Sequence, residues 1–138
     1  MVIKRLENKM KKYLFIVEKT NTGLSAYAKD DDINVGTTGK TMTELKANIL
    51  EAFNLLNEYQ NKKAISKENI AIQLDLNQFF EYYSDLIKAH GVAKRIGMNQ
   101  SLLSQYIGGD KKPSAKQTKR IIQGLKETAK EILELDIA

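Results

Sequence analysis

Four polar side chains near residue 100 have the types and spacing needed to read base edges in double-stranded DNA. They are Gln100, Ser101, Ser104 and Gln105. On a helix these positions share one side, while Leu103 and Tyr106 turn toward the other. A glutamine amide can make two hydrogen bonds to adenine, and a serine hydroxyl pairs with several bases. We therefore predict that this polar side contacts bases.

The residues before this helix are typical of two helices joined by a tight turn. Ala93 is small enough for a close helix crossing, and Gly97 suits a turn four residues later. Asn99 is a favourable N-cap for a recognition helix that runs from Gln100 to about Ile107. We predict a DNA-binding helix-turn-helix domain. The alternative is a three-helix bundle with glutamines on its surface.

The distribution of charge supports a polyanionic partner. The chain carries a net charge of +5, of which +1 falls before residue 60 and +4 after it. From Lys94 to Lys130, nine basic residues stand against two acidic ones, a local charge of +7. A concentration of one sign on a compact helical unit favours nucleic-acid binding over an ordinary solvated surface, which carries mixed signs.

The residues available for catalysis are few. The chain has no cysteine, which excludes disulfides, thiolate zinc sites and cysteine nucleophiles, and fits a reducing cytoplasm. Its single histidine, His90, has no nucleophile or metal ligand at a suitable spacing, so we expect a capping or surface role. Gly39-Lys40-Thr41 resembles the end of a phosphate-binding loop, but Asn34 stands where that loop needs glycine. We expect no cofactor and no metal.

The fold class predicted from the pattern is α+β, in two domains. Short strands are expected at residues 13–17, 24–28 and 33–37, followed by a helix at 42–59 with Thr41 and Glu44 as a capping box. Alternation from Ile70 to Leu76 predicts a fourth strand, and helices are expected at 78–83, 91–96, 100–107 and 114–135. The domains are then 12–76 and 77–138, after a flexible leader at residues 1–11.

No segment is suited to a membrane. The longest apolar run, Tyr13 to Val17, is far too short for a membrane-spanning helix or a signal-peptide core. We expect a cytoplasmic protein.

The C-terminal pattern resembles the phage-repressor (Cro/C1-type) helix-turn-helix family. The resemblance covers about the last 50 residues and is carried by the run from Gly91 to Gly109 with Lys-Lys-Pro-Ser at 111–114. His90 departs from it, because a Ser or Thr N-cap is usual at that place. The resemblance implies base contacts from the start of the recognition helix and phosphate contacts from the basic loop behind it. Together with the N-cap, the predicted phosphate-binding residues are Asn99, Lys111, Lys112, Ser114 and Lys116.

The N-terminal pattern resembles HicB-type antitoxins, whose partial RNase H-like domain has the same β-β-β-α-β order. The matching stretches are residues 13–18, 23–27, Gly36 and 39–45. The resemblance implies a type II toxin-antitoxin protein that caps an mRNA-cleaving, HicA-like toxin and represses its own operon as a homodimer or homotetramer on operator DNA. The alternative is a stand-alone transcription regulator with an N-terminal dimerisation or ligand module.

The acidic residues argue against a nuclease. Two-metal cleavage needs carboxylates that converge from separate elements, whereas Asp30, Asp31 and Asp32 fall in one turn. Glu18 and Asp75 are expected at strand ends. We therefore predict no enzymatic activity, and we assign the Asp30–Asp32 corner to the surface that faces a basic toxin.

Overall fold

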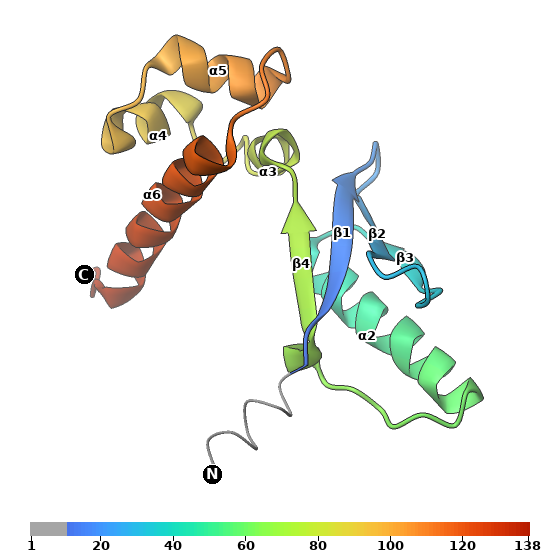
Figure 1. Ribbon diagram of the computed structural model, residues 1–138. Coiled ribbons are helices and arrows are strands. Elements are labelled where there is room, and N and C mark those ends of the chain that lie inside the picture. Colours follow the sequence, from blue (N-terminus) through green and yellow to red (C-terminus); the bar gives the residue numbers. More distant parts are fainter. Residues whose placement is uncertain (1–10) are drawn as a thin grey trace, which may run out of the picture. The chain divides into compact units, whose positions relative to one another are not determined.

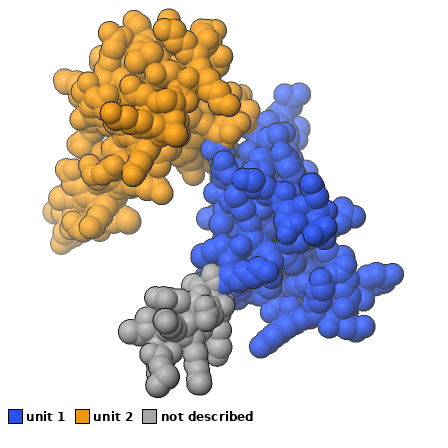
Figure 2. All heavy atoms as spheres, viewed as in Figure 1, with its two compact units in different colours: residues 1–74 blue, residues 75–138 orange. Residues whose placement is uncertain are grey.

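The chain divides into two compact units, residues 1–74 and 75–138 (Figure 2). The computed structural model describes residues 11–138, so the predicted leader lies outside the described residues except for Lys11. The division falls two residues before the boundary expected from the sequence. Its cause is Leu76, which begins a helix and is buried in the core of the second unit instead of ending the fourth strand.

The first unit is a four-stranded mixed sheet with one long helix. Its elements are β1 (Tyr13–Lys19), β2 (Leu24–Ala28), β3 (Gly36–Gly39), α2 (Met42–Tyr59), the short 3-10 helix η1 (Lys67–Asn69) and β4 (Ile70–Leu74) (Figure 1). The strand order is β3-β2-β1-β4. The pairs β1–β2 and β2–β3 are antiparallel, whereas β1 and β4 are parallel. A parallel pair needs a long crossover, and α2 supplies it.

The core of this unit lies between the sheet and α2. Alternate residues of β1 and β2 point toward the helix, and the buried apolar side chains of these strands and of α2 are Phe15, Val17, Leu24, Ala26, Leu45, Ile49 and Phe53. The Thr41 half of the predicted capping box is present, because the Thr41 hydroxyl accepts a hydrogen bond of 3.1 Å from the Glu44 amide. The helix begins at Met42 as this cap predicts, and it ends at Tyr59, also as predicted.

The third strand differs from its predicted position of 33–37. Ile33 belongs to the turn after β2, where its amide donates to the carbonyl of Asp30 at 3.0 Å. Val35 is buried, and the paired residues begin only at Gly36, opposite Tyr27. The turn formed by Asp30 thus delays the strand by three residues.

The second unit contains helices only. They are α3 (Leu76–Tyr82), α4 (Ala89–Ile96), α5 (Gln100–Gly108) and α6 (Ala115–Glu134). One core joins all four, made of Leu76, Phe80, Val92, Ala93, Met98, Leu103 and Ile121. The chain is therefore α+β, with one mixed sheet and five α-helices in the part that the structure describes. None of the helices at residues 11–138 combines the length and apolar character needed to cross a membrane.

Candidate nucleic-acid interface

Helices α4 and α5 are joined by a tight turn at residues 97–99. Gly97 has a φ of 69°, in the left-handed region that side chains other than glycine rarely adopt. The Met98 amide donates to the carbonyl of Ala93 at 2.9 Å, which closes the end of α4. Ala93 is 2% exposed, in agreement with the predicted need for a small residue in the core there. The turn geometry thus depends on the residues that the sequence pattern singled out.

The start of α5 is set by Asn99. Its Oδ1 accepts a hydrogen bond of 3.1 Å from the Leu102 amide, so the helix begins at Gln100 as predicted. This oxygen is occupied by the cap. An acceptor oxygen does not bind an anion in any case. A contact between Asn99 and a phosphate would have to use an N–H donor of the residue.

The predicted base-reading residues share the side of α5 opposite its anchor, although they differ in accessibility. Gln100, Ser101 and Ser104 are exposed, whereas Gln105 is half-buried. Leu103, on the opposite side, is fully buried and holds α5 in the core. The exposed donors and acceptors are therefore concentrated at the N-terminal end of the helix.

His90 was not predicted to take part in this surface. Its Nδ1 lies 3.0 Å from Oε1 of Gln100, a hydrogen bond in which the imidazole N–H donates to the amide oxygen. His90 is also not the N-cap of α4, because that helix begins at Ala89 with Lys88 as its cap. The contact orients the Gln100 amide at the start of α5. His90 and Gln100 are ten residues apart, and this spacing matches no helical period, so the sequence pattern did not predict their contact.

Three predicted phosphate ligands behind α5 are exposed to solvent. Lys111 and Lys112 lie in the loop, and Lys116 lies in the first turn of α6. Ser114 has a structural task, because its Oγ accepts a 3.1 Å hydrogen bond from the Gln117 amide and caps α6. The backbone amide of Lys111 donates to the carbonyl of Gln105 at 3.2 Å, which joins the loop to the end of α5.

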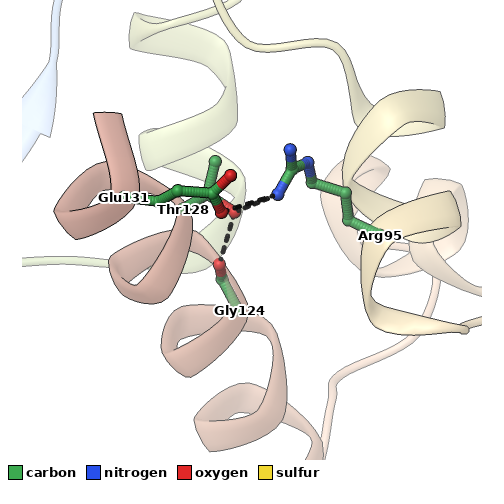
Figure 3. Close-up of polar contacts among 4 residues, drawn as sticks. All are labelled: Arg95, Gly124, Thr128 and Glu131. Atoms are coloured by element: carbon green, nitrogen blue, oxygen red, sulfur yellow. Dashed lines mark hydrogen bonds and ion pairs between the residues drawn. The ribbon is translucent and has the colours of Figure 1, made fainter. Parts of the chain in front are cut away.

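Two arginines of the basic window are engaged within the unit. Arg120 donates to the carbonyls of Ile96 and Gly97 at 2.8 and 3.0 Å, at the negative end of the α4 dipole. Arg95 reaches from α4 to α6, where its Nη1 lies 3.3 Å from the Thr128 hydroxyl and 3.5 Å from the Glu131 carboxylate (Figure 3). Both residues hold α4 against α6, so part of the +7 charge serves the fold.

The acidic corner at residues 30–32 lies between β2 and β3. Asp30 builds the turn, since its Oδ1 accepts from the Asp32 amide at 3.0 Å. All three side chains are exposed. Within residues 11–138, no three His, Asp or Glu side chains converge in a way that would hold a metal ion.

No protein-family model matches this chain, and comparisons with curated proteins and with solved structures found no match.

Proposed function

We propose that the chain is a DNA-binding repressor whose α4 and α5 form a helix-turn-helix of the Cro/C1 type. The observation that carries the proposal is the division of α5 into a buried anchor, Leu103, and an exposed N-terminal side with Gln100, Ser101 and Ser104. A helix held in this way can enter a major groove with its polar end against the base edges.

The surroundings of α5 are consistent with such a docking. Lys111 and Lys112 follow the helix on an exposed loop, and Lys116 is exposed in the first turn of α6, so cations would meet the phosphate backbone there. His90 fixes the Gln100 amide before DNA arrives, which reduces the entropy lost on binding. We assign base contacts to the two glutamines, Gln100 and Gln105, and to the two serines, and backbone contacts to the lysines.

We further propose that the first unit is a HicB-like, partial RNase H-like domain that caps a HicA-like, mRNA-cleaving toxin. This would make the chain the antitoxin of a type II toxin-antitoxin system, acting in the cytoplasm as a homodimer or homotetramer and repressing its own operon. Two features support it: a sheet unit with β-β-β-α-β order, compact in its own right, and the exposed acidic side chains of Asp31 and Asp32. A basic toxin would be attracted to that corner.

DNA reading is tested by footprinting the full chain on DNA upstream of its gene. Gln100→Ala should relax base preference and weaken binding to the operator by about 1–3 kcal/mol. Lys112→Ala should weaken binding to all sequences alike. Gln123→Ala, an exposed glutamine on α6, is the matched control and should behave as the wild type. Unchanged affinity and preference in both Gln100→Ala and Gln105→Ala would show that α5 is not the recognition helix.

Toxin capping is tested separately, by co-purifying the full chain with the product of a neighbouring gene. Replacing Asp31 and Asp32 by lysine should weaken the complex, whereas Glu58→Lys, an exposed charge reversal on α2, should leave it unchanged. A chain that binds operator DNA but no neighbouring gene product would be a stand-alone transcription regulator instead.

A further inference from the structure

The second unit has an apolar groove on the α4–α6 side. Its volume is about 480 Å³, and its apolar walls are formed by Leu86, Ile87, Val92, Ile96, Leu125 and Ile132. Leu86, at one wall, is 75% exposed although it is a large aliphatic side chain. No residue of α5 lines this groove, so an occupant would leave the exposed side of that helix accessible.

A second apolar surface begins where the groove ends. Ile132 belongs to the groove wall, and it is followed by Leu133, Leu135 and Ile137, which are 85%, 58% and 80% exposed. These residues extend past the end of α6 at Glu134. Exposed large apolar side chains in one contiguous segment indicate an interaction site. We call residues 132–137 the apolar segment.

The charges of the two surfaces are complementary. Lys88 and Arg95 line the groove and are exposed, and Arg95 also forms the ion pair with Glu131. Glu134 and Asp136 alternate with the leucines and the isoleucine of the apolar segment. A segment that entered the groove with its apolar side chains inward would thus bring carboxylates toward the basic residues at the groove.

We propose that the groove receives the apolar segment of a second copy of this chain, in a reciprocal, two-fold symmetric exchange. Groove and apolar segment adjoin at Ile132, so each copy carries both halves of the contact, as a two-fold interface requires. Each copy then covers the exposed aliphatic side chains of the other. The inference rests on the proposed function only in that a palindromic operator is read by two copies, and its test contains no DNA.

The association should be moderate in strength. A stable interface usually buries about 800 Å² on each partner, and an exchange of one short segment per copy is at the small end of that range. We expect a dissociation constant on the order of micromolar for the full chain.

Sedimentation equilibrium of the full chain measures this constant. Leu86→Glu in the groove and Leu135→Glu in the segment should each raise it about tenfold or more, because each places a charge in an apolar contact. Leu55→Glu is the matched control: Leu55 is 61% exposed on α2, outside the proposed interface, and its replacement should change nothing. All three sites are exposed, so the fold should survive.

Charge reversal tests the pairing itself. Lys88→Glu should weaken association, as should Glu134→Lys combined with Asp136→Lys. Arg95 stays positive, so the variant with all three changes should recover only part of the affinity, but should associate more tightly than the Glu134→Lys, Asp136→Lys variant. The chain has no cysteine, so a disulfide between two introduced cysteines can be assigned directly. Leu86→Cys protein mixed with Leu135→Cys protein should form an intermolecular disulfide on mild oxidation. Leu55→Cys protein mixed with either of them should not.

A chain that stays monomeric at about 100 micromolar would overturn the proposal, because that concentration is roughly a hundredfold above the expected dissociation constant. So would an association that Leu86→Glu and Leu135→Glu leave intact, or one that only Leu55→Glu disrupts. A chain that associates in this way but does not bind operator DNA in the footprinting experiment would count against the proposed function alone.

Discussion

Replacement of Gly124 by alanine tests whether α4 and α6 cross as closely as the structure indicates. A Cβ atom at this position would lie 2.2 Å from Cγ2 of Ile96, whereas carbon atoms in contact are usually about 3.5–4.0 Å apart. A β-branched side chain in a helix has one strongly preferred rotamer, so Ile96 cannot swing aside easily. The two helices must separate by about 1 Å or more.

The free energy of unfolding should fall, although two effects oppose each other. Overpacking of this kind costs about 1–3 kcal/mol, and alanine recovers up to about 1 kcal/mol over glycine through helix propensity. At a contact as short as this one, the packing cost should exceed the gain, leaving a net loss of about 1–2 kcal/mol. Gly91→Ala is the matched control, because the new Cβ on α4 meets nothing within 4 Å. It should be neutral or slightly stabilising.

The assay is urea unfolding of the full chain followed by circular dichroism, with amide hydrogen exchange to assign the loss to residues 75–138. Ile96→Ala removes the clashing methyl group, so adding it to Gly124→Ala should cost less than the sum of the single changes, with a coupling of about 1 kcal/mol. If Gly124→Ala were as stable as Gly91→Ala and showed no coupling to Ile96, the close helix crossing would be refuted.

Asn99→Ala removes the cap of α5 and should lower stability by about 1 kcal/mol in the same unfolding assay. Asn99→Asp keeps the acceptor oxygen and should have the stability of the wild type. An equal loss of stability in both variants would rule out the cap as the cause. Lys112→Ala should reduce the slope of log binding constant against log salt by about one, and an unchanged slope would remove Lys112 from the phosphate contacts. With magnesium or manganese the purified chain should leave RNA, DNA and hybrids intact; cleavage abolished by Asp30→Asn would reverse that expectation. A fragment of residues 1–74 should neutralise a neighbouring toxin in co-expression without binding DNA. Rescue by residues 75–138 alone would transfer toxin binding to the helical unit.

The elements whose bounds could be predicted are those governed by residues a few positions apart. Thr41 caps α2 through the Glu44 amide, and Asn99 caps α5 through the Leu102 amide, so both helices begin where the sequence predicts. The left-handed φ at Gly97 is local in the same way. Short-range hydrogen bonds and backbone preferences depend on the types of neighbouring residues, so the sequence pattern was sufficient to predict where these helices begin.

Periodicity alone misplaced the end of β4, because the apolar alternation of the strand continues into the first residue of α3. Ile70, Ile72, Leu74 and Leu76 alternate with more polar residues, but only the first three belong to β4. Leu76 is buried in the helical core of the second unit. Which core receives an apolar side chain depends on packing, and a spacing of two residues carries no information about it.

The sequence by itself determined the α+β class, the order of the elements and the polar side of α5. Only the tertiary structure decided how α4 and α5 are supported. His90 meets Gln100 ten residues later, Arg120 reaches the carbonyl of Ile96 from 24 residues away, and Gly124 admits the side chain of Ile96. These contacts exist because helices pack in three dimensions at specific separations, and the residues involved are ordinary surface or helix residues until the chain has folded.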